Sequence, residues 1–134
     1  GQIVISGHLN AVISALNTFK KIGAKMALLL PVSGAFHSPL MQSAYDEFKH
    51  SLEKVTFSDA DVPVYSNVNG KPSKSAKKLK NNILQQILKP VLWTQTIEHM
   101  ISDGVKEVVE LGPGKVLQGL VKRIDRSLQL SGIQ

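Results

Sequence analysis

Apolar residues recur with two different periods near the start of the chain. Gln2 to Ser6 is a short apolar and β-branched run that ends at a glycine, which is typical of a buried strand. From about Asn10 to Ile22, apolar residues return every three or four positions, and Gly23 favours termination of a helix there. The run from Met26 to Leu30 ends at a proline and predicts a second strand. These residues therefore predict a strand, helix, strand unit.

The rest of the chain predicts more helices than strands. Ser38-Pro39 favours a helix start, because serine can cap the free amides and proline at the first position lacks only a donor that the helix does not need. The further elements that we expect are helices at about Ala76 to Leu88, Thr94 to Ser102 and Val116 to Leu128, strands at Val62 to Val68 and Val105 to Leu111, and turns at Asn69-Gly70 and Gly112-Pro113-Gly114. Strands separated by helices indicate parallel pairing and an α/β fold. The strands are fewer than in a typical sheet of about 4 to 6, which suggests that sheet neighbours are missing from this chain.

Composition narrows the class of protein. With 134 residues and 43% hydrophobic residues, the chain has enough apolar mass for one compact core. It contains no apolar run of the roughly 20 residues that a membrane-spanning helix needs, and its first residues do not resemble a signal peptide. We therefore expect a soluble, cytoplasmic protein. The absence of cysteine excludes disulfides, thiolate metal ligands and a cysteine nucleophile.

Positive charge dominates the sequence. Sixteen Lys and Arg against ten Asp and Glu give a net charge of +6, which favours an anionic partner. Five of the ten residues from Lys71 to Lys80 are lysine, with no aromatic residue or arginine to stack on bases or to read base edges. The stretch is best interpreted as a solvated loop, with contact to an acidic protein as the second interpretation and nucleic acid as the third.

One of the four histidines stands in a setting that favours chemistry. His8, His50 and His99 lie before or within helices among polar neighbours, where a surface or hydrogen-bonded role is expected. His37 lies in a short loop directly before a capped helix, and loops held by rigid elements often carry function. Taken alone, one histidine in one loop leaves a structural role open.

Other motifs for catalysis or metal binding are missing. No second histidine stands at helical spacing from His37, and no carboxylate occurs in the four residues after it, so we expect no metal site there. The chain lacks the Gly-x-Ser-x-Gly elbow of serine acyltransferases. The segment Gly112-Pro113-Gly114-Lys115 lacks the spacing of a phosphate-binding loop and is better interpreted as a sharp turn between a strand and a helix.

The order of segments resembles the malonyl-CoA:acyl carrier protein transacylase family over essentially the whole chain. The sequence Gly34-Ala35-Phe36-His37-Ser38-Pro39-Leu40-Met41 is similar to the catalytic-histidine loop of that family. The other segments that match in order are Gly1 to Gly7, Gly23 to Ser33, Pro63 to Gly70, Gln86 to Trp93 and Glu110 to Leu117. The resemblance implies the C-terminal part of an α/β-hydrolase-like acyltransferase domain. In this scheme residues 1–33 are a remnant of a small ferredoxin-like subdomain, and residues 34–134 belong to the large catalytic domain.

The resemblance also implies a site. A serine takes malonyl from coenzyme A and passes it to the phosphopantetheine thiol of acyl carrier protein, so malonyl-CoA and the phosphopantetheinylated carrier are substrates and no cofactor is bound permanently. His37 is expected to act as general base and acid. Gln86 is expected to orient His37 through a carbonyl oxygen, either of its main chain or of its side chain. Phe36 is expected to limit room beside the malonyl group, which gives a preference of about 1 to 3 kcal/mol against an added methyl.

The chain departs from the family pattern in one important respect. The serine elbow, the oxyanion loop and the malonate-binding arginine of the family all precede the matching part, so the isolated chain is expected to be inactive. The resemblance implies acyl carrier protein and malonyl-CoA as partners, with neither nucleic acid nor membrane. Two alternatives stay open: an acyltransferase module of a polyketide or fatty-acid megasynthase, and a non-catalytic basic module that binds an acidic protein through Lys71 to Lys80.

Overall fold

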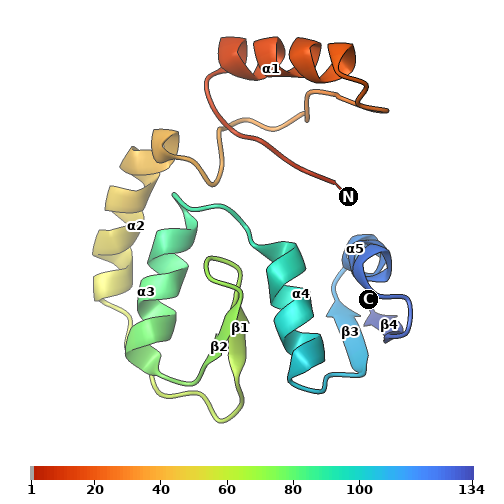
Figure 1. Cartoon of the computed structure of the whole chain (residues 1–134). Coiled ribbons are helices and arrows are strands. Elements are labelled where there is room, and N and C mark those ends of the chain that lie inside the picture. The colour runs from red at the N-terminus through yellow and green to blue at the C-terminus, as the bar shows by residue number, and fades with distance from the viewer. Residues whose placement is uncertain (1) are drawn as a thin grey trace.

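The computed structural model describes residues 2–134 and mixes helices with short strands (Figure 1). In chain order the elements are α1 (Leu9–Lys21), the 3-10 helix η1 (Pro39–Met41), α2 (Gln42–Glu53), β1 (Val64–Ser66), β2 (Lys71–Ser73), α3 (Ala76–Gln86), α4 (Trp93–Ser102), β3 (Glu107–Leu111), α5 (Val116–Ile124) and β4 (Gln129–Ile133). The predicted α/β class is confirmed.

The N-terminal segment keeps the predicted helix but not the predicted strands. Helix α1 forms where the periodicity placed it, and Gly23 follows with a φ of 93°. Residues 2–6 and 26–30 are not strands, so both strand predictions were wrong. The physical reason is that a strand needs a hydrogen-bonded neighbour, and neither segment pairs with a strand among residues 2–134. Their side chains stay open to solvent, with Ile3 88% and Met26 78% exposed.

Helices α2 and α3 pack against each other beside a small hairpin, as the left part of Figure 1 shows. Strands β1 and β2 pair in antiparallel register, Val64 opposite Ser73, and the turn at Asn69-Gly70 occurs as predicted. Strand β2 was not predicted, and the interpretation of Lys71 to Lys80 as a loop was wrong. This stretch forms β2 and then the start of α3, because β1 offers a pairing edge and the Ser75 side chain accepts a hydrogen bond from the Lys78 amide.

The C-terminal part contains the only parallel pairing among residues 2–134. Strand β3 pairs with β4, from Glu107 opposite Gln129 to Leu111 opposite Ile133. The predicted helix that was to include Leu128 ends at Ile124, and β4 was missed. Leu128 is buried with Ile97 and Val121 in the main hydrophobic core, but it lies in the connection before β4. A buried apolar residue at helical spacing is compatible with a longer helix or with a connection into a strand, and tertiary packing decides between the two.

The hairpin and the C-terminal part are connected through α4. The Leu92 amide, at the start of α4, donates a hydrogen bond of 2.8 Å to the Asn67 carbonyl after β1. The ring nitrogen Nδ1 of His99 lies 2.7 Å from the carbonyl oxygen of Gly70, at the turn of the hairpin. Helix α4 in turn packs on α5 through the core around Ile97. His99 is therefore hydrogen-bonded within the fold, as its sequence context suggested.

Candidate active site

The loop before η1 holds His37 in an unusual backbone conformation. Its φ of 60° lies in the left-handed region, which non-glycine residues adopt uncommonly. The Ser38 side chain is 6% exposed, and its hydroxyl donates a hydrogen bond of 2.7 Å to the Ala35 carbonyl. The same oxygen accepts from the Leu40 amide at 3.3 Å, which caps η1. These bonds brace the loop on both sides of His37, while the His37 side chain itself is exposed.

The C-terminal end of α3 meets the His37 ring. The main-chain oxygen of Gln86 lies 2.8 Å from Nδ1 of His37. This carbonyl is free to accept, because the amides of the next residues bond to the carbonyls of Leu84 and Gln85 instead. A carbonyl oxygen only accepts, so the neutral ring carries its proton on Nδ1, and Nε2 keeps its lone pair. The arrangement leaves an exposed imidazole with a basic nitrogen available to a further group.

The side chain of Gln86 has a different set of contacts from its main chain. Its amide nitrogen donates to the carbonyls of Lys89 and Pro90, at 3.0 and 3.3 Å, and lies 3.4 Å from Nδ1 of His37. The side chain thus fixes the path of the chain after α3. The sequence left open whether the main-chain or the side-chain carbonyl faces the histidine, and the shorter contact is to the main chain.

Phe36 lies on the same loop and is 45% exposed. Its ring approaches Gly34, since a Cβ built at Gly34 would lie 3.5 Å from the ring and 3.7 Å from the Met41 sulfur. Gly34, Phe36 and Met41 therefore meet beside the histidine loop. Because Phe36 is exposed, packing in the core of residues 2–134 does not explain the presence of a phenylalanine at this position.

A buried glutamate near the C-terminus was missed by the sequence interpretation. Glu110 is 8% exposed, and its carboxylate accepts from the amides of Leu117 and Gln118 at 3.0 and 3.2 Å and from the Gln118 side chain at 3.1 Å. These bonds bridge the Gly112-Pro113-Gly114 turn and satisfy the free amides at the start of α5. The amide of Leu117 and the donors of Gln118 hold the pKa of Glu110 below its usual value. A glutamate just before a glycine-rich turn into a helix was the available signal.

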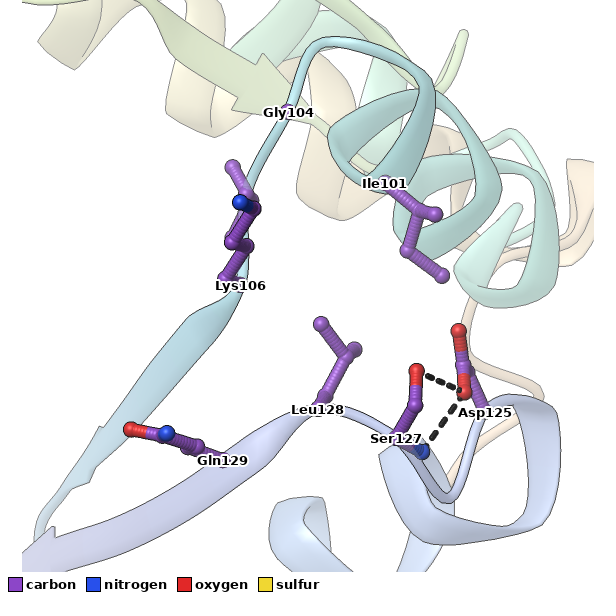
Figure 2. A pocket seen from close by; sticks show the side chains of 8 residues that line it. Ile101, Gly104, Lys106, Asp125, Ser127, Leu128 and Gln129 are labelled. Carbon is purple, nitrogen blue, oxygen red and sulfur yellow. Dashed lines mark hydrogen bonds between the residues drawn. The ribbon is translucent and has the colours of Figure 1, made fainter.

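Two hollows lie away from His37. Figure 2 shows the larger, of about 390 Å³, between the end of α4 and the start of β4, where the Asp125 carboxylate accepts two bonds of 2.7 Å from Ser127. The amide and hydroxyl of Ser127 lower the pKa of Asp125. The second hollow, of about 230 Å³, lies between α2 and α3.

Among residues 2–134, acidic residues and histidines form no group suited to a metal ion, and none of the helices has the length and apolar character of a membrane span.

Two bacterial proteins of the same name are similar to this chain. The chain is 43% identical over 129 residues to the malonyl CoA-acyl carrier protein transacylase of Bacillus subtilis strain 168, covering 96% of this chain and 41% of that protein. It is 39% identical over all 134 residues to the Staphylococcus aureus strain COL protein of the same name, covering 44% of it. Over its whole length the chain is thus similar to the C-terminal part of malonyl CoA-acyl carrier protein transacylases. No protein-family model matches the chain.

Solved structures of transacylases agree with this assignment. An acyl carrier protein S-malonyltransferase from Vibrio cholerae superposes with a TM-score of 0.91 at 39% identity, covering 96% of this chain and 42% of that one. A malonyl-transacylase in complex with a type II polyketide synthase acyl carrier protein superposes with a TM-score of 0.89 at 38% identity, covering 95% and 41%. The chain thus spans less than half the length of the transacylases that it matches.

Proposed function

We propose that this chain supplies the catalytic histidine for transfer of a malonyl group from malonyl-CoA to the thiol of acyl carrier protein in fatty-acid biosynthesis. The observation that carries the proposal is the exposed His37 ring, whose Nδ1 lies 2.8 Å from the Gln86 carbonyl. The similarity to transacylases over the whole chain supports the same reaction. The serine nucleophile would come from the part of the transacylase length that this chain does not span.

In this mechanism Nε2 of His37 moves one proton in each direction. It takes the proton of the serine hydroxyl as the oxygen attacks the malonyl thioester carbonyl. The carbon–sulfur bond then breaks, and the imidazolium returns the proton to the coenzyme A thiolate. In the second half-reaction His37 takes the proton of the carrier thiol, whose sulfur attacks the malonyl-serine ester, and then returns it to the serine oxygen. No proton, electron or group is left over.

Gln86 would act as the positioning residue. Its main-chain oxygen would keep the Nδ1 proton in place and hold Nε2 toward the serine, the task that a buried aspartate performs in protease triads. A neutral carbonyl carries only partial negative charge, so it stabilises the imidazolium less than a carboxylate does. The contact between Gln86 and His37 across 49 positions supports this role.

Phe36 would limit the room beside the acyl group. Its ring is exposed next to His37 and lies against Gly34 and Met41, so a substrate at His37 would meet it.

We also propose that residues 1–33, of which Gly1 lies outside the described residues, belong to a small subdomain and that residues 34–134 belong to the large one. In Figure 1, residues 2–33 run separately from α2 and α3, which supports this division.

A chimera tests the function directly. The part of the Bacillus subtilis transacylase that precedes its matching region would be joined to this chain, and malonyl transfer from malonyl-CoA to the phosphopantetheinylated carrier would be measured. We expect transfer by the chimera and a loss of at least about a hundredfold in kcat for His37→Ala, the scale of a lost general acid and base.

The matched control is His50→Ala on α2. His50 is exposed, and its ring nitrogen Nδ1 lies 3.8 Å from Oε2 of Glu53, whereas it is His37 that contacts the Gln86 carbonyl, so the loss of His50 should leave kcat unchanged. Transfer by a folded His37→Ala chimera at the unaltered rate would refute the proposed role, and so would an equal loss in both variants.

A further inference from the structure

The backbone of His37 is held in a conformation that is unfavourable by itself. Among residues 2–134, His37 is the only residue other than glycine with a positive φ. For a residue with a Cβ, the left-handed conformation is disfavoured by about five- to thirtyfold relative to the right-handed one. Such a conformation persists only where the surrounding structure holds it, and it occurs most often at functional sites.

The next residue, Ser38, makes hydrogen bonds on both sides of His37. Its hydroxyl donates to the Ala35 carbonyl at 2.7 Å, before His37, and accepts from the Leu40 amide at 3.3 Å, after it. We call this pair of bonds the Ser38 brace. The hydroxyl is thus donor and acceptor at once, which satisfies a side chain that is only 6% exposed. The Ser38 brace closes the main chain around His37.

The main chain of Ser38 is itself fixed by its neighbours along the chain. Pro39 follows it, and the residue before a proline is confined to extended conformations. Ser38 has a φ of −137° and a ψ of 163°, and its carbonyl accepts a hydrogen bond of 3.1 Å from the Met41 amide. Because the hydroxyl is attached to a fixed main chain, the Ser38 brace holds the histidine loop and does not move with it.

The conformation of the His37 backbone decides where the ring lies. The φ angle sets the direction of the Cα–Cβ bond relative to the preceding chain, and the ring follows that bond. With φ at 60°, Nδ1 of His37 lies 2.8 Å from the Gln86 carbonyl at the end of α3. A main chain that returned to the right-handed region would turn the ring away from this carbonyl.

We propose that Ser38 is a positioning residue: its hydroxyl keeps the His37 backbone left-handed and so keeps Nδ1 on the Gln86 carbonyl. This rests on the proposed function, in which His37 transfers the proton. Without the Ser38 brace, the left-handed form competes with more favourable conformations, and only the fraction of molecules that retains it is competent. Ser38 moves no proton in the reaction.

Two other roles for Ser38 do not fit its contacts. A simple helix cap would use the hydroxyl as an acceptor toward Leu40, but the shorter bond is the one that it donates to Ala35, on the other side of the histidine. A nucleophile must give its proton to the histidine ring and reach the substrate. The Ser38 hydroxyl already donates to a carbonyl, and its side chain is buried.

The first test measures malonyl transfer by the chimera with Ser38→Ala. We expect kcat to fall by about tenfold, which is the population lost when the left-handed conformation is no longer held. Ser51→Ala on α2 is the matched control. The Ser51 hydroxyl is exposed and donates a bond of 3.3 Å to the Glu47 carbonyl within the same helix, so the same substitution there should leave kcat unaltered.

The second test observes the His37 ring directly, because a merely structural role of Ser38 would not change it. Nitrogen NMR of labelled histidines shows which ring nitrogen of the neutral imidazole carries the proton. In the unaltered chimera we expect the proton on Nδ1, since the Gln86 carbonyl accepts it. In Ser38→Ala we expect a mixture with the Nε2 form. The His50 ring, beside Glu53, is the internal reference and should not change.

Ser38→Cys keeps the proposal testable where Ser38→Ala does not fold. A thiol has nearly the shape of a hydroxyl but is a weak donor and acceptor, so it fills the space and weakens the Ser38 brace. We expect a lower kcat and a mixed tautomer, both less marked than in Ser38→Ala. A folded variant of either kind with unaltered kcat and tautomer overturns the proposal, as does a lower kcat with the proton still fixed on Nδ1.

The two proposals fail in different ways, because the tautomer is measured without substrate. A proton on Nδ1 that depends on Ser38, in a chimera that transfers no malonyl, overturns the proposed function and leaves the positioning role of Ser38 standing. Transfer that is lost in His37→Ala but fully kept in a folded Ser38→Ala does the reverse.

Discussion

At the scale of single residues, two polar side chains are held by hydrogen bonds to main-chain groups of another element. His37 bonds to the carbonyl of Gln86, and Glu110 bonds to the amides of Leu117 and Gln118. In both cases the main-chain group is one that a helix end leaves without an intrahelical partner. Helix ends therefore do the positioning here, at the C-terminus of α3 and at the N-terminus of α5.

Glu110 predicts a pH-dependent stability. Its pKa is lowered in the folded chain, so its contribution is fully present above the usual value of 4.5 and is lost as the pH falls through the lowered pKa. Glu110→Gln keeps the shape but not the charge, so its chimera should melt several degrees below the unaltered one at pH 7. The gap should narrow below about pH 4.5, as the carboxylate becomes protonated.

The control for this measurement is on the same strand. Glu107→Gln alters an exposed glutamate of β3 and should change the melting temperature little at either pH. A gap for Glu110→Gln that stays constant down to pH 3, or that widens there, would show that the carboxylate does not cap α5.

At the scale of elements, the β1–β2 turn lies close against α4. A Cβ at Gly70 would lie 3.2 Å from the Thr96 amide nitrogen and 3.3 Å from Cβ of Gln95. The φ of Gly70 is 65°, which is also unfavourable for a side chain. The hairpin and α4 can approach this closely only because the turn residue is glycine.

A pair of glycine substitutions separates the two effects. Gly23→Ala after α1 meets only the strain of a φ of 93°, because no atom lies within 4 Å of the added Cβ, and it should cost about 1 to 2 kcal/mol of unfolding free energy. Gly70→Ala should cost about 1 kcal/mol more, because the α4 backbone must shift. Urea denaturation of both chimeras measures the difference in unfolding free energy. Equal losses of unfolding free energy would mean that the α4 backbone shifts without cost.

At the scale of the whole molecule, much apolar surface remains open. Ile3, Met26, Leu111 and Val116 are each at least 70% exposed, and β3 and β4 form a sheet of only two strands. An isolated pair of strands is marginally stable in water, and contiguous exposed apolar surface favours association. The main core is small, centred on Ile97, Val121 and Leu128.

This surface predicts different behaviour of the chain alone and in the chimera. Alone, the chain should bind a hydrophobic dye strongly and elute from a sizing column above its 14.6 kDa mass. In the chimera, dye fluorescence per molecule should fall even though the molecule is larger, because the added part covers these residues. A chain that stays monomeric and binds no dye would contradict the prediction.

The sequence alone determined the local structure and the candidate residues. Helix periodicity and capping predicted α1, α2, α3 and α4 within a few residues, because these signals depend on neighbours along the chain. The histidine loop and Gln86 were picked out by their resemblance to a family, and their catalytic roles stay proposals. The turn at Gly70 was also readable, since few residues other than glycine accept a positive φ.

Only the tertiary structure decided which extended segments become strands. Residues 2–6 and 26–30 have stronger strand patterns than Gln129–Ile133, yet only the latter pairs, because β3 is available beside it. The main-chain contact of Gln86 with His37, 49 positions away, was likewise undetermined, whereas the capping by Glu110 had a local signal that was missed. The physical reason is the same in each case: a hydrogen bond between distant segments depends on which surfaces meet, and no local pattern records that.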